Sequence, residues 1–156
     1  MINLVGTYEC KIDAKGRISV PSGLKKQFPA LETGFVLKRS VFEKCVELYP
    51  NSEWEKLTAK LAKLNQFVKK NQLFVRKFLA GSKQIEIDDA GRMLLSKDLL
   101  DYAQITKDVV LSANVGKIEI WDKDLYEQSI AISDDDFSEL AEDVMGEINF
   151  DDFGIS

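Results

Sequence analysis

The sequence predicts a mainly β protein with short helices, built from two copies of one unit. Two stretches of 15 residues share one pattern: GTYECKIDAKGRISV begins at Gly6, and GSKQIEIDDAGRMLL begins 75 positions later at Gly81. Apolar and polar residues alternate at the start of each copy, with the period of a half-buried strand. An Asp-x-x-Gly turn follows the alternation in both copies. Because the features recur in the same order, we expect two equivalent β units in one chain.

Each copy opens with a predicted β-hairpin. The alternating apolar positions are Tyr8, Cys10 and Ile12 in the first copy and Ile85 and Ile87 in the second. The turns that follow are Asp13-Ala14-Lys15-Gly16 and Asp88-Asp89-Ala90-Gly91. An aspartate can accept hydrogen bonds from the amides of its own turn, and glycine adopts positive φ without a steric penalty. A second strand is then expected over residues 17–20 and 92–95.

The rest of each unit is predicted to be a short helix followed by two strands. Pro21-Ser22 opens the helix of the first copy and Ser96 opens that of the second, since these residues favour helix N-termini. The last two strands are expected over residues 35–38 and 46–49, and again over 109–112 and 118–121. These boundaries make residues 1–50 the first repeat and residues 81–131 the second.

Residues 51–80, between the repeats, are predicted to form a helical linker. Ser52 and Glu55 fit a capping box at the start of a first helix. A second helix is expected to carry Phe67, Phe74 and Phe78 and to end at Gly81. Apolar residues at helical spacing predict that the linker packs between the repeats: Trp54, Leu57, Leu61, Leu64 and Val68. The linker is also basic, which fits either a solvated helix face or a surface that attracts DNA.

Charge is divided unevenly along the chain. The formal net charge is −5, but from Asp124 onward there are eleven acidic residues and no basic one, so residues 1–123 carry a net charge of +6. An acidic total therefore does not exclude a nucleic-acid partner, because binding depends on the local field. Residues 132–156 are predicted to form an acidic amphipathic tail, with Ser133 at a helix N-terminus. Its apolar stripe is Phe137, Leu140, Val144, Met145 and Ile148. The tail either stays solvated or docks by this stripe on the body or on a neighbouring subunit.

The composition disfavours several functional classes. The chain has no histidine, the commonest general base and zinc ligand, and Cys10 and Cys45 fit no metal-ligand spacing. A catalytic pair of Asp13 and Asp88 would be a poor proton donor, because a neighbouring arginine keeps the pKa of each carboxyl low. No apolar run approaches the roughly 18 residues of a membrane helix, and residues 1–5 lack the basic start of a signal peptide. We expect no enzyme activity, cofactor, metal or membrane partner, and a cytoplasmic location.

The paired motifs resemble those of the MraZ family. GTYECKIDAKGRISVP, FVLKRS, VELYPNSEW, FVRKFLAGS and KIEIWDKDLYE occur in the family's order and cover about residues 6–128. The family belongs to the AbrB/SpoVT/MazE group of swapped-hairpin folds. The resemblance implies an AbrB/MazE/MraZ-like double-split β-barrel, formed within one chain as a pseudo-dimer. The sequence departs from the family pattern at Ala90, where the first turn has Lys15, at Ser96, where proline is frequent, and after about residue 131, where no family motif matches.

The resemblance also implies which residues contact DNA. The DNA-binding positions carried over are Lys15, Arg17 and Arg92, and those that support the turns are Asp13, Gly16, Asp88 and Gly91. The chemistry of these side chains agrees with that role. An arginine fork matches guanine O6 and N7 in the major groove, and a lysine can meet a phosphate as a point charge. The alternative role for the arginines is a surface salt bridge.

The resemblance implies a sequence-specific transcriptional regulator located in the cytoplasm and associated with the nucleoid. Its expected targets are short G-rich direct repeats in the promoter of the division and cell-wall gene cluster. Its expected partners are double-stranded DNA and copies of itself in a head-to-tail cyclic homo-oligomer. The alternative is an antitoxin-like protein-binding module of the same fold, whose acidic tail would wrap a toxin.

Overall fold

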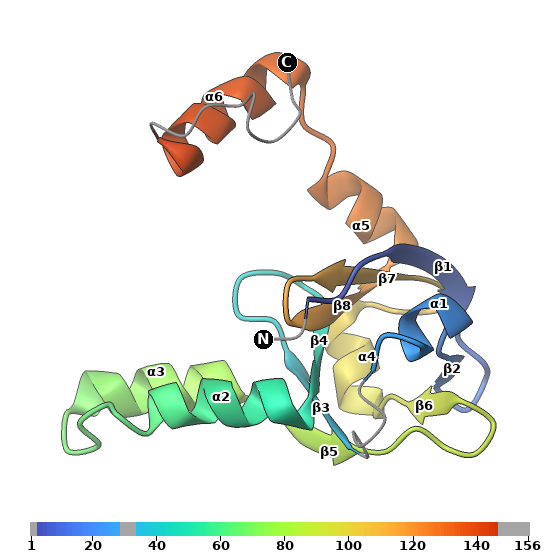
Figure 1. Ribbon diagram of the computed structural model, residues 1–156, viewed down its shortest axis with the longest axis horizontal. Helices are drawn as coiled ribbons and strands as arrows, with labels where there is room; N and C mark the ends of the chain where they lie inside the picture. The colour runs from blue at the N-terminus through green and yellow to red at the C-terminus, as the bar shows by residue number, and fades with distance from the viewer. Residues whose placement is uncertain (1–2, 29–33, 147–156) are drawn as a thin grey trace. The chain divides into compact units, whose positions relative to one another are not determined.

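The computed structural model describes residues 3–28 and 34–146, and the chain divides into two compact units, Met1–Asp124 and Leu125–Ser156 (Figure 1). The strands are β1 (Thr7–Lys11), β2 (Arg17–Ser19), β3 (Phe35–Arg39), β4 (Val46–Pro50), β5 (Lys83–Ile85), β6 (Arg92–Leu94), β7 (Asp108–Asn114) and β8 (Lys117–Asp122). The helices are α1 (Ser22–Lys25), α2 (Asn51–Leu61), α3 (Lys69–Leu79), α4 (Lys97–Ala103), α5 (Lys123–Ser129) and α6 (Asp134–Met145).

Within the described residues, the strands form a six-stranded antiparallel sheet and a two-stranded antiparallel ribbon. The sheet has the order β1-β7-β8-β4-β3-β5, and the ribbon pairs β2 with β6. The first strand of each repeat therefore pairs with a strand of the other repeat. Exchanging the repeats reverses the strand order of the sheet and reproduces it, which gives the unit an internal pseudo-twofold axis. The predicted fold, mainly β with two interlocked repeats in one chain, is confirmed.

The strand register follows the same pseudo-symmetry. Tyr8 lies opposite Leu111 where β1 pairs with β7. The equivalent residues, Lys83 and Leu37, lie opposite each other where β5 pairs with β3. A slip of one residue would turn every buried side chain of a strand outward, so burial of one face fixes this register.

The core of the first unit is built by both repeats. Ile18 of β2 lies opposite Met93 of β6, and both side chains are almost fully buried. Leu24 of α1 and its equivalent in α4, Leu99, are also fully buried in the same cluster. Since apolar burial is the main favourable term in folding, this shared core holds the two repeats together.

The linker forms two helices that extend away from the sheet, and the expected capping box is wrong (Figure 1). Pro50 takes the N-cap position with φ −58° and ψ 146°, so α2 begins at Asn51 and Ser52 lies within its first turn. The ring of proline fixes φ at about −65°, which suits the start of a helix, so α2 begins earlier than the capping box predicted. The second helix begins at Lys69, which leaves Phe67 in the connecting loop with 97% of its surface exposed. Both helices contact β3 and α2 also contacts β4; packing of the linker between the repeats stays a prediction.

The second unit contains the predicted tail helix. Ser133 is the N-cap of α6, and its hydroxyl oxygen accepts a hydrogen bond of 3.1 Å from the Asp136 amide, as expected from the sequence. The apolar side chains of Phe137, Leu140 and Val144 are exposed, and Ile148 lies outside the described residues. Among the helices of residues 3–28 and 34–146, none combines the length and the apolar character needed to span a bilayer.

Candidate nucleic-acid interface

The predicted DNA-contacting arginines share one face of the β2–β6 ribbon. Side chains alternate between the two faces of a strand, so the burial of Ile18 and Met93 turns their neighbours outward. The outer face carries Arg17, Ser19, Arg92 and Leu94. Arg17 lies opposite Leu94 and Arg92 lies opposite Ser19, which makes the arginines diagonal neighbours, about 7–8 Å apart at the backbone. Ser19 and Leu94 were missed from the sequence, although their spacing of two from each arginine is the relevant signal.

In the first turn, one carboxylate both closes the turn and orients the arginine. Asp13 Oδ1 accepts hydrogen bonds of 2.9 Å from the backbone amides of Lys15 and Arg17. Asp13 Oδ2 accepts a hydrogen bond of 2.7 Å from Arg17 Nε. The Gly16 amide completes the turn by donating to the Asp13 carbonyl at 3.1 Å. The guanidinium is therefore anchored to its own turn at Nε.

The second turn reproduces this arrangement. Asp88 Oδ1 accepts from the amides of Ala90 at 3.0 Å and Arg92 at 2.9 Å, and Oδ2 accepts from Arg92 Nε at 3.1 Å. The Gly91 amide donates to the Asp88 carbonyl at 2.9 Å. The two turns lie at opposite ends of the antiparallel ribbon, so each aspartate accepts a hydrogen bond from the arginine of its own turn.

One glycine in each turn joins that turn to the opposite repeat. The Gly16 carbonyl accepts a hydrogen bond of 2.9 Å from the Leu95 amide, and the Gly91 carbonyl accepts one of 2.9 Å from the Val20 amide. The φ angles of Gly16 and Gly91 are +86° and +78°, which side chains rarely adopt. The turn that carries each arginine is thus held by both repeats.

The arginine ends are the accessible donors of the ribbon. The side chains of Arg17 and Arg92 are 30% and 35% exposed. Their only hydrogen bonds to side chains in the described parts of the chain are those from Nε to the aspartates. The terminal amino groups are left to meet an acceptor pair such as guanine O6 and N7, and Lys15 is exposed within the first turn.

The titratable groups near the ribbon lack the character of a catalytic pair. The Arg17 amide is the largest cause that lowers the pKa of Asp13 to about 2; burial opposes it, and the Arg17 side chain and Lys15 amide lower it further. The Arg92 amide likewise lowers the pKa of Asp88. Both carboxyls are ionised at neutral pH and have no proton to donate. Burial raises the pKa of the Cys10 thiol to about 11, which keeps it protonated.

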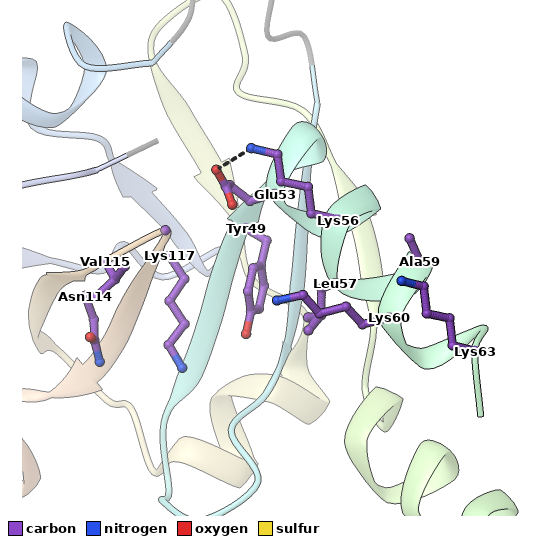
Figure 2. A pocket seen from close by; sticks show the side chains of 11 residues that line it. Tyr49, Glu53, Lys56, Leu57, Ala59, Lys60, Lys63, Asn114, Val115 and Lys117 are labelled. Carbon is purple, nitrogen blue, oxygen red and sulfur yellow. Dashed lines mark hydrogen bonds and ion pairs between the residues drawn. The ribbon is translucent and has the colours of Figure 1, made fainter. Parts of the chain in front are cut away.

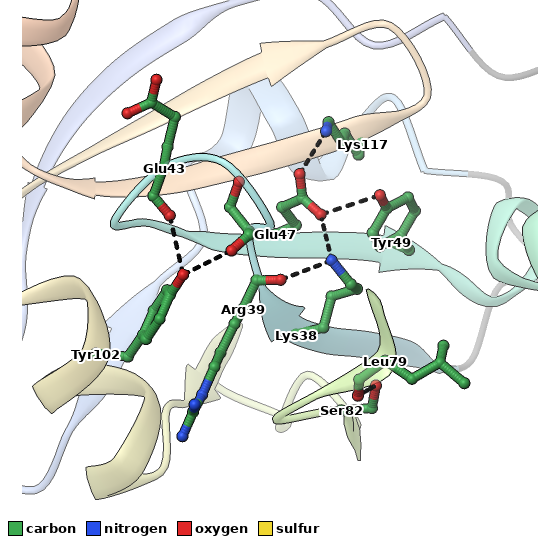
Figure 3. Close-up of polar contacts among 10 residues, drawn as sticks. Lys38, Arg39, Glu43, Glu47, Tyr49, Leu79, Ser82, Tyr102 and Lys117 are labelled. Atoms are coloured by element: carbon green, nitrogen blue, oxygen red, sulfur yellow. Dashed lines mark hydrogen bonds and ion pairs between the residues drawn. The ribbon is translucent and has the colours of Figure 1, made fainter. Parts of the chain in front are cut away.

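A buried ionic cluster in the sheet was not predicted from the sequence (Figure 3). Lys38 is fully buried, and its Nζ donates to Glu47 Oε1 at 2.9 Å. Glu47 also accepts hydrogen bonds from Tyr49 at 3.1 Å and from Lys117. It lies opposite Glu119 on the pseudo-twofold axis, so the lysines offset a like-charge pair. Burial alone would raise the pKa of Glu47, but the bonds from Lys117 and Lys38 bring it below its usual value.

A basic groove lies between α2 and the β7–β8 turn (Figure 2). Its volume is about 710 Å³. Apolar surface comes from Tyr49, Leu57 and Val115, and Val115 is exposed. The lining lysines are Lys56, Lys60, Lys63 and Lys117. This combination of apolar surface and positive charge suits an acidic amphipathic segment better than a neutral small molecule.

Comparison with known proteins relates both halves of the chain to one family. The family model described as "MraZ protein, putative antitoxin-like" matches residues 4–77 and again residues 78–147. The second match extends past residue 131, where the resemblance read from the sequence ends, and includes α6 through Met145.

Relatives match over nearly their whole length. The chain is 58% identical over 157 residues to "Transcriptional regulator MraZ" of Flavobacterium psychrophilum, with 100% of both chains covered. It is 56% identical over 152 residues to the protein of that name from Christiangramia forsetii, covering 97% of this chain and 98% of the relative. A third protein of that name, from Bacteroides thetaiotaomicron, is 34% identical over 154 residues, covering 97% and 98%.

Proposed function

The chain belongs to the MraZ family, and from this premise we propose that it is a transcriptional regulator that binds double-stranded DNA through the β2–β6 ribbon. The observation that carries the proposal is the placement of Arg17 and Arg92 on one outer face, each anchored at Nε by an aspartate. The major groove admits a two-stranded β-ribbon, and an arginine fork matches the acceptors of guanine. Relatives named as transcriptional regulators support the same reading.

In this proposal, the ribbon residues have different roles. Arg17 and Arg92 read guanines, and Lys15 contacts a phosphate and fixes the position of the ribbon. The proposed targets are short G-rich direct repeats in the promoter of the division and cell-wall gene cluster. The protein would act without catalysis, in the cytoplasm at the nucleoid, because its task is to occupy promoter DNA.

Selection of duplexes from a random pool, followed by binding measurements on the selected site, tests the proposal. Arg17→Ala and Arg92→Ala should each cost about 1–3 kcal/mol of specific binding, the value of a bidentate base contact. Arg76→Ala is the matched control, since Arg76 is an exposed arginine of α3 outside the ribbon. It should leave the preference for the selected site unchanged. Full operator affinity in a folded double variant lacking both ribbon arginines would contradict the proposal.

We also propose that several copies assemble head to tail on such repeats. One chain presents one ribbon and covers one short box, so boxes in the same orientation need several copies in the same orientation, as a closed ring of heterologous contacts provides. Residues 51–80 hold seven basic and two acidic residues, whereas residues 123–146 hold one basic and eight acidic residues. Because β4 and β8 are antiparallel, α2 and α5 begin at opposite ends of this strand pair.

The contact proposed for this assembly is α6 of one copy in the basic groove of the next. The exposed stripe of α6 would cover Tyr49, Leu57 and Val115. Its acidic face would meet Lys60 and Lys63, since Lys56 and Lys117 already pair with Glu53 and Glu47. Light scattering of the full chain should show an oligomer that Phe137→Glu weakens. Ser138→Glu adds the same charge to α6 at the next residue, at the margin of the stripe, and is the control that should weaken the oligomer less. Only monomer at micromolar concentration, or a palindromic selected site, would contradict assembly in one orientation.

An antitoxin-like role is the second candidate, and the exposed apolar stripe of α6 supports it. In that role the stripe would bind a partner protein rather than a second copy. Co-expression with the product of an adjacent gene is the test: relief of a growth defect that Phe137→Glu abolishes would favour this role. No such toxic neighbour, together with an α6-dependent homo-oligomer, would rule it out.

A further inference from the structure

The two turns of the ribbon differ in charge. The first turn, residues 13–17, contains Lys15 and has a net charge of +1. The second turn, residues 88–92, has Ala90 at the equivalent position and an additional acid at Asp89, so its net charge is −1. Both ends of the ribbon would face phosphates when it lies in a groove. The second turn alone would repel them.

A lysine from the opposite repeat lies at this second turn. A Cβ built on Gly91 would be 3.2 Å from Nζ of Lys25, the last residue of α1. The Val20 amide bonds to the Gly91 carbonyl just before α1, which brings this helix of the first repeat to the second turn.

The pseudo-symmetry shows that this position is exchanged with the lysine of the first turn. The equivalent of Lys25 is Leu100, since the preceding residues, Leu24 and Leu99, are both fully buried at matching places. Leu100 Cδ1 lies 3.4 Å from a Cβ built on Gly16. Each turn is therefore neighboured by a short helix of the other repeat. The turn that has its own lysine meets a leucine, and the turn that lacks one meets a lysine.

We propose that Lys25 supplies the phosphate-binding cation of the second turn, in place of the lysine that Ala90 lacks. This rests on the proposed binding of DNA by the ribbon. The Lys25 side chain is exposed and forms no ion pair with the residues that the structure describes, so its ammonium is available to a ligand. With it, the net charge around the second turn rises from −1 to 0.

The dependence of operator affinity on salt measures such a contact directly. Each phosphate contact contributes about 0.9 to the slope of log K against log salt concentration. Lys25→Ala and Lys15→Ala should each reduce the slope by about 0.9, and the double variant by about 1.8. Lys26→Ala is the control, because Lys26 is the next residue, is exposed and carries the same charge. It should change the slope less.

Restoring the lysine at its other position separates this role from a structural one. The Lys25→Leu, Ala90→Lys double variant places a lysine in the second turn and a leucine beside it, as at the first turn, and it should recover the slope that Lys25→Leu loses. If Lys25 had only a structural role, a lysine at position 90 would not restore the slope. An unchanged slope in Lys25→Ala beside a reduced one in Lys15→Ala, or equal losses in Lys25→Ala and Lys26→Ala, would overturn the inference. If the ribbon arginine variants also bind DNA normally, the proposed function itself fails.

Discussion

Replacing Glu47 with leucine should destabilise the fold far more than removal of an exposed charge. The carboxylate accepts hydrogen bonds from Lys38, Tyr49 and Lys117 inside the sheet, and the Lys38 side chain is 0% exposed. Without the carboxylate, Lys38 Nζ keeps its 2.6 Å hydrogen bond to the Arg39 carbonyl and its place 4.5 Å from the centre of the Phe78 ring, but it loses its anionic partner. Removing one partner of a buried pair typically costs about 3–5 kcal/mol, because the other charge stays buried without compensation. That is a large share of the 5–15 kcal/mol that stabilises a typical protein.

Urea unfolding measures this loss as a lower midpoint at unchanged slope. The effect should also depend on pH. The folded-state pKa of Glu47 lies below its ordinary value of 4.5, so ionisation of the group stabilises the fold above that pH. This contribution is lost as the pH falls through the folded-state pKa. The difference between the wild type and Glu47→Leu should therefore narrow in acid.

Two further variants make the prediction refutable. Glu9→Ala breaks an exposed ion pair with Lys123, whose side chains are 64% and 41% exposed, and should cost at most about 1 kcal/mol. Lys38→Met combined with Glu47→Leu removes both charges of the buried pair and should restore most of the stability. Replacement of a buried ion pair by apolar residues of similar volume often leaves the free energy of unfolding unchanged or raises it. A loss in Glu47→Leu no larger than that in Glu9→Ala would refute the reasoning.

Three other predictions concern the turns and the tail. Asp13→Asn should remove a part of the stability that depends on pH. The folded-state pKa of Asp13 is lowered from 3.8 to about 2, so ionised Asp13 stabilises the fold above pH 3.8, and this contribution is lost as the pH falls toward about 2. The urea midpoints of the wild type and Asp13→Asn should therefore converge in acid. Gly16→Ala should be more destabilising than Gly91→Ala in urea. Both φ values are positive, with a typical strain of about 1–3 kcal/mol, but a Cβ at Gly16 would also lie 2.9 Å from the Leu95 carbonyl oxygen, whereas at Gly91 it meets the mobile end of Lys25. Deletion of residues 132–156 changes the formal net charge from −5 to +4, and should raise affinity for random duplexes most at low salt, as filter binding at two salt concentrations can check.

The local pattern of the sequence predicted the strands and turns because each depends on few neighbouring residues. Alternation placed Tyr8 in a half-buried strand, and the Asp-x-x-Gly order placed Asp13 and Gly16 in a tight turn. Duplication then indicated that the halves are equivalent. The family resemblance implied that the repeats interlock, but the pairing of β1 with β7 instead of β3 was not predicted, because no local pattern distinguishes pairing within a repeat from pairing between repeats.

Features that depend on distant residues were not predictable from the sequence. Lys38 follows three apolar residues in a strand, but only the folded sheet brings its ammonium group and that of Lys117 to the Glu47 carboxylate. Lys25 looks like an ordinary helix-end lysine until the crossing of the hairpins places it beside Gly91. The error in the predicted capping box has a local cause, because Pro50 and Ser52 both suit the start of a helix and Pro50 takes the N-cap position.

Fusion of two repeats in one chain lets the ends of the ribbon differ, and this bears on the kind of site it can read. In a dimer of identical chains, any substitution appears at both ends, so the reading surface is symmetric and suits a palindrome. Here the two arginine anchors are kept, with Nε–Oδ2 distances of 2.7 Å and 3.1 Å, while Lys15 and Ala90 differ between the turns. The ribbon therefore has a direction. In the proposed complex with DNA, such a ribbon would prefer one orientation, and copies bound in one orientation would require direct repeats rather than inverted ones.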